Sequence, residues 1–175
     1  MKLSNLLMII ISGSLLLAGC QVNQQSSESK TSSLHAAKTK TAVPATFRQQ
    51  TFTVKNEASF TLTNHAVENS STKNRQLLVI RMTVKNLGKR EFTPADVWSK
   101  YVWAEQDGKR LTTGNLAFST NQTSDNNLMN RSVMPVKPGQ SAKILATFEP
   151  KTKSIINVHF TNQKNTIHVS RYTVR

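Results

Sequence analysis

The side chains in this sequence that are suited to chemistry are few and widely separated. The four histidines do not have the spacing of metal ligands. The chain also has no Gly-x-Ser-x-Gly nucleophile elbow and no phosphate-binding glycine loop. Residues 125–127, Asp-Asn-Asn, offer oxygens to a calcium ion, but one carboxylate is a poor cage for a hard cation. We therefore predict no catalytic residue, no metal site and no cofactor, and we expect that the protein is not an enzyme.

The one reactive group with a clear setting is the thiol of Cys20, the only cysteine in the chain. It follows an apolar run, residues 6–17, which comes after the positive end Met1-Lys2. That run is too short for a membrane span, which needs roughly 20 apolar residues, and it has the length of a signal-peptide core. The ending Leu17-Ala18-Gly19-Cys20 matches the lipobox of bacterial lipoprotein precursors.

The lipobox predicts cleavage between Gly19 and Cys20 and a diacylglyceryl group on the Cys20 sulfur. A lone cysteine in an exported chain has no disulfide partner, whereas a thioether consumes the thiol. Two acyl chains, at ~0.8 kcal/mol per buried methylene, make release from a membrane negligible. We expect residues 1–19 to be a removed signal peptide and the mature protein to be anchored at the extracytoplasmic face of the cell membrane.

Residues 20–46 form the second predicted segment. After Cys20 this segment consists mainly of Gln, Ser, Thr, Ala and Lys. A segment without large apolar side chains cannot offset its ordering entropy by burial. We predict a disordered linker that leads to a folded domain over residues 47–175. The alternative is a frayed extra strand that contains Leu34 or Val43.

The predicted domain shows the period-two alternation of β-strands. In residues 76–86, the apolar side chains at 78, 80, 82 and 84 point one way and those between them point the other. Residues 144–148 and 156–160 repeat the pattern. No window of comparable length has a sustained period of 3.6, so we predict little or no helix beyond the signal peptide.

Turn signals support the same fold class. Asp107-Gly108 favours a two-residue hairpin, because both central positions need positive φ, and this register places Glu105 opposite Arg110. Residues 137–140, Lys-Pro-Gly-Gln, favour a type II turn. We predict an all-β fold, an antiparallel β-sandwich, with residues 114–130 as its one long polar loop.

Aromatic side chains cluster just before the Asp-Gly hairpin. They are Trp98, Tyr101 and Trp103, and Tyr101 and Trp103 share a face if the segment is a strand. An exposed pair would grip a glycan or a partner protein, because flat amphipathic rings anchor interfaces. The alternative is that the rings fill the core of the sandwich.

Charge gives the other indication of a partner. The chain has a formal charge of +14, and residues 47–175 hold 19 lysines and arginines against 8 aspartates and glutamates, a charge of +11. Such a surface attracts anionic lipid, anionic wall polymer or nucleic acid, although export removes intracellular nucleic acid from reach. The candidate contacts are the pairs Lys89-Arg90 and Lys109-Arg110. A charge that serves solubility alone is the alternative.

Four segments together resemble a known family. They are LLVIRMTVKNLGKREF, PADV, DGK and KPGQSAKILATFEP, within residues 47–162, and the most telling parts are Val84-Lys85-Asn86 followed by Gly88, and Pro138-Gly139 nine residues before Phe148. The combination resembles the immunoglobulin-like domain family of bacterial secreted lipoproteins, a domain of unknown function related to the secreted immunoprotective-antigen fold. The resemblance implies an immunoglobulin-like sandwich, an anchored extracellular setting and no established catalytic residues.

Two classes of function follow from these observations. The first is a membrane-anchored extracellular lipoprotein with a non-enzymatic binding module for an envelope component, which would be an anionic polymer, anionic lipid or a partner protein. The alternatives are an envelope-associated enzyme or accessory factor, and capture of extracellular nucleic acid through the basic surface.

Overall fold

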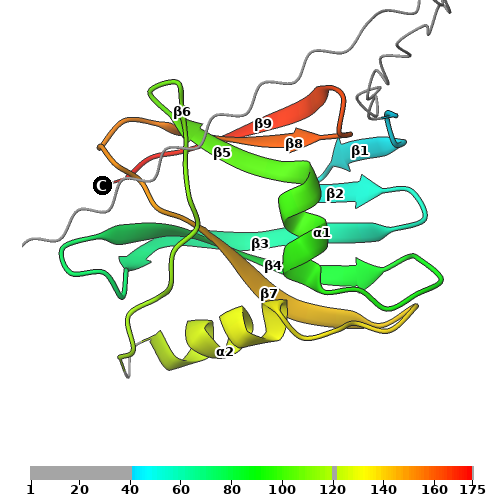
Figure 1. The fold of residues 1–175 in the computed structure, drawn as a ribbon, viewed down its shortest axis with the longest axis horizontal. Helices are drawn as coiled ribbons and strands as arrows, with labels where there is room; N and C mark the ends of the chain where they lie inside the picture. Colours follow the sequence, from blue (N-terminus) through cyan, green and yellow to red (C-terminus); the bar gives the residue numbers. More distant parts are fainter. Residues whose placement is uncertain (1–40, 120–121, 175) are drawn as a thin grey trace, which may run out of the picture. The chain divides into compact units, whose positions relative to one another are not determined.

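The computed structural model describes residues 41–119 and 122–174, which belong to one compact unit (Figure 1). The predicted signal peptide, the cleavage site at Gly19, the lipidation site at Cys20 and most of the predicted linker lie outside the described residues. Among the residues described, no helix combines the length and the apolar character needed to cross a membrane.

Nine strands in this part of the chain form two antiparallel sheets. The five-stranded sheet has the order β1 (Ala45–Arg48), β2 (Thr51–Val54), β3 (Ala58–Asn69), β4 (Gln76–Asn86) and β7 (Ser141–Phe148). The four-stranded sheet has the order β6 (Lys109–Arg110), β5 (Val102–Gln106), β8 (Ile156–Thr161) and β9 (Thr166–Tyr172). Two helices, α1 (Pro94–Tyr101) and α2 (Thr123–Ser132), complete the elements of the described chain.

Strand β4 shows why the two sheets pack face to face. Its side chains at 78, 80, 82 and 84 lie in the core together with Phe52 and Phe60 of the same sheet and Val158 and Phe160 of the other. Removing this apolar area from water is the main favourable contribution to folding. The predicted fold class, an all-β antiparallel sandwich, is confirmed.

Both predicted turns are present. Glu105 pairs with Arg110 in the β5–β6 hairpin, and Asp107 and Gly108 have φ angles of 51° and 71°. In the turn before β7, Gly139 has a φ of 76°, and the N–H of Gln140 donates to the carbonyl of Lys137 at 3.0 Å. Left-handed backbone is what glycine adopts without a steric cost.

The prediction of little or no helix is wrong, first at α1. This helix starts at Pro94 and has Asp96 in its first turn and Lys100 in its last, which suits the helix dipole. Its apolar side chains Val97, Trp98 and Tyr101 all enter the core. Burial of that face, rather than the length of the helix, stabilises it.

The second correction concerns the predicted loop over residues 114–130, because α2 begins at Thr123. The helix lies against β7, on the side of the five-stranded sheet that faces away from the other sheet (Figure 1). Its Leu128 and Met129 pack on a separate apolar cluster. That cluster consists of Leu77, Val79, Leu116 and Leu145. The outward side chains of β4 are therefore buried at this end by α2.

Described residues on the N-terminal side of the predicted domain boundary also belong to the fold. Strand β1 starts at Ala45, and the N–H of Val43 donates to the carbonyl of Asn162 at 3.1 Å. Val43 and Ala45 both pack against the core. The end of the predicted linker is thus part of the sandwich.

Candidate functional site

The predicted aromatic cluster is divided by the end of α1. Trp98 and Tyr101 are only 6% and 0% exposed, and the Trp98 ring lies edge-on to Phe60 and Phe160 at 5.3 and 5.8 Å. The expectation that Tyr101 and Trp103 share a face is wrong, because Tyr101 ends a helix and Trp103 belongs to a strand. Trp98 and Tyr101 fill the core, and Trp103 alone remains partly exposed to a partner.

Trp103 lies on the outer face of the four-stranded sheet between two basic side chains. Its ring stacks on that of His159, its cross-strand partner, at 4.0 Å and an interplanar angle of 3°. The guanidinium of Arg110 lies 5.4 Å from the indole centroid, a cation–π contact. One aromatic and one basic candidate from the sequence, Trp103 and Arg110, therefore meet at this position.

A groove of about 580 Å³ opens beside Trp103. Three cations line it: Lys100 at the end of α1, Arg110 of β6 and Lys164 of the β8–β9 turn. The other lining residues are Ser99, Thr161, Gln163, Asn165 and Thr166. No carboxylate lines the groove, so its polar groups are cations, hydroxyls and amides.

The turn that carries Lys164 is held by Asn162. Its side-chain oxygen accepts the N–H groups of Lys164 and Asn165 at 3.1 and 2.8 Å, a local bond pattern that asparagine favours in turns. Gln163 has a φ of 72°, in the left-handed region. The backbone at the rim of the groove is therefore fixed, while the Lys164 side chain is exposed.

Lys100 differs from the other two cations because it has an ion pair. Its ammonium lies 2.8 Å from a carboxylate oxygen of Glu57, and the Tyr101 hydroxyl donates to the other oxygen. Burial lowers the pKa of Lys100, but the contacts with Glu57 and Tyr101 together outweigh it and the pKa is raised. Burial, and then Glu57, raise the pKa of Tyr101. Among the described ion pairs none includes Arg110 or Lys164, which leaves both free to meet an anion.

Glu105 is the acidic residue beside the stacked rings of Trp103 and His159. Its carboxylate lies 3.2 Å from Nε2 of His159, in an orientation that forms no hydrogen bond. Glu105 also faces Arg110 across the hairpin without a direct ion pair. It does not line the groove.

The other predicted basic contacts lie elsewhere. Lys89 and Arg90 are exposed in the loop after β4, where the Asn86 side chain donates to the carbonyl of Arg90 at 2.8 Å. Lys109 is exposed next to Arg110 but does not line the groove. Of the four basic candidates, the structure brings only Arg110 to Trp103.

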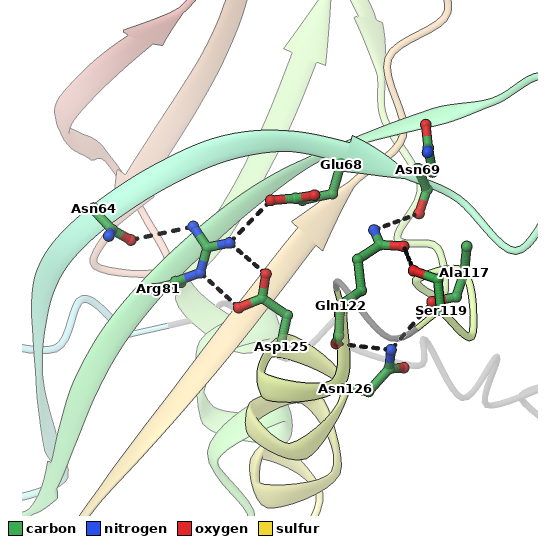
Figure 2. A network of polar contacts seen from close by, with 9 residues as sticks. All are labelled: Asn64, Glu68, Asn69, Arg81, Ala117, Ser119, Gln122, Asp125 and Asn126. Carbon is green, nitrogen blue, oxygen red and sulfur yellow. Dashed lines mark hydrogen bonds and ion pairs between the residues drawn. The ribbon is translucent and has the colours of Figure 1, made fainter.

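A polar network around Arg81 was not predicted from the sequence (Figure 2). Nε of Arg81 donates to Asp125 at 2.6 Å, and its terminal nitrogens bond to Asp125, to Glu68 at 3.1 Å and to Asn64 at 3.3 Å. The hydrogen bond to Asp125, more than any other cause, raises the pKa of Arg81. This bidentate pair fastens α2 to β4, so its role is structural.

The start of α2 is held by the same group of contacts (Figure 2). The Gln122 side chain donates to the carbonyl of Asn69 at 3.1 Å, and that of Asn126 donates to the carbonyl of Ala117 at 3.2 Å. Asp125, the carboxylate considered for calcium, is committed to the guanidinium of Arg81. In the described ranges, no cluster of three or more His, Cys, Asp or Glu could hold a metal ion.

A second hollow, of about 460 Å³, lies between β3 and β9. It reaches the core side chains Leu62 and Ile80, and its charged cation is Arg171. His65 lies edge-on to Tyr172 there at 4.8 Å. It contains none of the partner or anion contacts proposed from the sequence, and it lacks the cation cluster of the Trp103 groove.

The chain is similar to known proteins in its sequence family and in its fold. A family model of a domain of unknown function, DUF5067, matches residues 29–162. A search of curated proteins finds no match. A structure from Staphylococcus aureus, described as a candidate lipoprotein, is similar with 14% identity and a TM-score of 0.63 over 75% of this chain and 92% of that chain. An NMR structure of a protein from Enterococcus faecalis is similar with 13% identity and a TM-score of 0.60 over 75% and 94%. These likenesses show a shared fold.

Proposed function

The chain belongs to the family of the domain of unknown function DUF5067, and from that premise we propose that it is a lipid-anchored extracellular lipoprotein whose sandwich binds an anionic envelope component without catalysis. The observation that carries the binding role is the groove beside Trp103. Its lining has two cations without ion pairs, Arg110 and Lys164, and no carboxylate.

The anchor is supported by the lipobox at residues 17–20. The fold is also similar to that of an S. aureus protein described as a candidate lipoprotein. A diacylglyceryl group on Cys20 would hold the binding domain close to the outer surface of the membrane. Anionic groups of the envelope would then be at high local concentration around its cations.

The non-enzymatic role is supported by the way carboxylates are used. Glu57 bonds to Lys100 and Tyr101, while Glu68 and Asp125 bond to Arg81. Glu149 bonds to Lys151 and lies 3.6 Å from Arg75; the bond to Lys151, more than any other cause, lowers its pKa. Acid–base catalysis needs carboxyl groups whose pKa is near the operating pH and that face a cleft. These four carboxylates instead contact basic side chains within the fold, and none of them lines the groove beside Trp103.

Arg110 has the geometry for an anionic group such as a phosphate. Its guanidinium is planar and rests on the Trp103 ring, which limits the conformations that it loses on binding. An anion in the groove would accept bonds from Arg110 and Lys164, and the hydroxyls of Ser99 and Thr166 would reach neutral parts of the ligand.

The test is an NMR titration of the full chain in detergent micelles with glycerol phosphate, a small phosphate-bearing polyol. We expect the indole N–H signal of Trp103 to shift at low salt. The double variant Arg110→Glu with Lys164→Glu should weaken binding by about tenfold or more, since a hydrogen bond to a charged group contributes ~1.5–3 kcal/mol.

The matched control is Lys73→Glu with Lys153→Glu, which makes the same change in net charge at two exposed lysines outside the groove. We expect the control to bind almost as well as the parent chain. An equal loss of affinity in both variants would show that net charge alone accounts for the binding. The groove would then have no specific role.

A further inference from the structure

The outer face of the five-stranded sheet carries a second polar surface, at the end that α2 does not cover. Strand register aligns its outward side chains in two rows. The first row is Arg48, Thr51, Thr61, Thr83 and Lys143. The second row is Thr46, Thr53, Ser59, Lys85 and Ser141. We call these ten residues the hydroxyl–lysine face.

The register shows that these side chains share one face. Strand neighbours alternate between faces, and the residues between the ten, such as Phe52, Phe60 and Val84, are buried in the core. None of the ten is buried. The hydroxyls of Thr51 and Thr61 lie 3.1 Å apart across β2 and β3.

The composition of this face is unusual for the molecule. It has seven hydroxyl residues, three cations, no carboxylate and no large apolar side chain. None of the described ion pairs includes Arg48, Lys85 or Lys143. Elsewhere on the same outer face, α2 packs on the apolar cluster and Asp125 pairs with Arg81. Arg48, Lys85 and Lys143 therefore face solvent without a compensating charge.

We propose that the hydroxyl–lysine face binds an extended polyol-phosphate polymer, with Arg48, Lys85 and Lys143 contacting phosphates and the rows of hydroxyls bonding to the polyol. Neighbouring strands are ~4.8 Å apart, so the four steps from Arg48 to Lys143 span about 19 Å. One phosphate cannot meet cations so far apart, but successive phosphates of a polymer can.

The side chains of the face are less suited to a protein partner or to nucleic acid than to the polymer. A protein partner usually needs a buried aromatic or apolar anchor, and this face offers none. Binding of single-stranded nucleic acid relies on aromatic rings for base stacking, which are also missing from these ten positions. Hydroxyls and cations together complement a ligand that alternates hydroxyl groups with phosphates.

This inference goes beyond the function proposed for the groove. The ten residues of the hydroxyl–lysine face share no member with the groove lining, which belongs to the other sheet and its connections. Either surface can therefore be altered without changing the other, and the two proposals can fail separately.

The role of the charges on the face is tested by calorimetry at low salt. The experiment measures the affinity of the full chain, in detergent micelles, for a soluble poly(glycerol phosphate). We expect Lys85→Glu with Lys143→Glu to weaken binding by about tenfold or more, because each basic side chain near a polyanion contributes measurably to attraction. Lys73→Glu with Lys153→Glu is the control of equal net charge, and it should bind within about threefold of the parent chain.

The hydroxyls are tested separately with Thr61→Val and Thr83→Val in one chain. Valine keeps the shape and favours strands, so the fold should persist while two hydroxyls are lost. We expect binding of the polymer to fall by about threefold or more at unchanged charge. Binding equal to that of the parent chain would overturn the assignment of the hydroxyls to the polyol.

Two further outcomes would overturn the proposal. The first is loss of polymer binding in the Arg110→Glu and Lys164→Glu variant but not in the Lys85→Glu and Lys143→Glu variant. The polymer would then bind the groove alone. The second is tighter binding of a single-stranded oligonucleotide than of poly(glycerol phosphate), lost in the same face variants, which would assign the face to nucleic acid.

Discussion

Single residues decide what the groove can do, and Arg110 is the clearest case. The sequence singled out Trp103 for its ring and Arg110 for its charge, on separate grounds. The predicted pairing of Glu105 with Arg110 already implies that Trp103 and Arg110 are close together. Trp103 is two residues before Glu105, so it lies diagonal to Arg110 across the hairpin. The direction of side chains in the hairpin is therefore the signal that would have predicted the contact between Trp103 and Arg110.

His168 supports a prediction about pH. Its ring stacks on Phe47 at 3.8 Å and an interplanar angle of 10°, and Nε2 lies 3.1 Å from the Ser170 hydroxyl. Burial lowers the pKa of His168 below its ordinary value of 6.5. The unfolded chain then binds a proton more readily than the folded one, so this contribution to stability is complete above pH 6.5 and is lost as the pH falls through the lowered value.

We expect His168→Phe to reduce the loss of stability between pH 8 and pH 5. Phenylalanine keeps a flat ring against Phe47 but cannot take up a proton. The measurement is urea unfolding of both chains at several pH values, and the comparison cancels the titration of the other histidines. The same slope of unfolding free energy with pH in both chains would exclude His168 as a source of acid sensitivity.

At the scale of elements, the strands could be predicted and the helices could not. Period-two alternation and two turn signals gave the fold class and the β5–β6 register, because a strand with one buried face requires that pattern. Helix α1 has only eight residues, too few for a sustained period of 3.6. Pro94 at its start and the spacing of Val97, Trp98 and Tyr101 were signals that a search for short helices would find.

The sequence signal for helix α2 is weaker than that for α1. Its ten residues are mostly polar, with several asparagines, which have modest helix propensity. Its position depends on contacts that are distant in the chain, above all Asp125 with Arg81, 44 residues away. Tertiary contacts of this kind are not visible in local patterns, so a loop was the natural interpretation.

The Arg81–Asp125 pair gives a prediction about this helix. We expect Asp125→Ala to lower the free energy of unfolding by about 2 kcal/mol, because a partly buried guanidinium loses its bidentate partner. Hydrogen exchange should increase first in α2, since the change acts where the helix is fastened to β4. The measurements are urea unfolding and amide exchange by mass spectrometry.

The matched control is Glu149→Ala, at an acidic residue whose two partners are about half exposed. Arg75 and Lys151 have exposed fractions of 45% and 47%, so this change should cost less than about 1 kcal/mol. An Asp125→Ala chain that is as stable as the control, with unchanged exchange in α2, would show that apolar packing alone holds the helix.

At the scale of the whole molecule, the fold decides which of the positive charges remain without an acidic partner. Several of the few carboxylates form ion pairs within the fold, whereas many of the lysines and arginines do not. The sequence alone gave the sign and size of the charge but showed only dispersed basic residues. The two surfaces with uncompensated cations become visible once strand register and the β8–β9 turn place distant residues together.

The anchor is the property of the whole protein that sequence predicts and that a variant can test directly. Cys20 is the only residue that can accept the diacylglyceryl group, and the run before it has the length of a signal peptide rather than of a membrane span. We expect Cys20→Ala to abolish lipidation, so that the protein leaves the membrane fraction for the medium or remains as unprocessed precursor. Cell fractionation with immunoblotting and mass spectrometry of the N-terminus measure both outcomes.

Ser26→Ala is the control, since it changes a hydroxyl in the predicted linker without touching the lipobox, and it should leave the protein on the membrane. A Cys20→Ala protein that is processed and retained like the parent chain would refute the lipid anchor, and with it the proposed enrichment of anionic envelope groups around the domain.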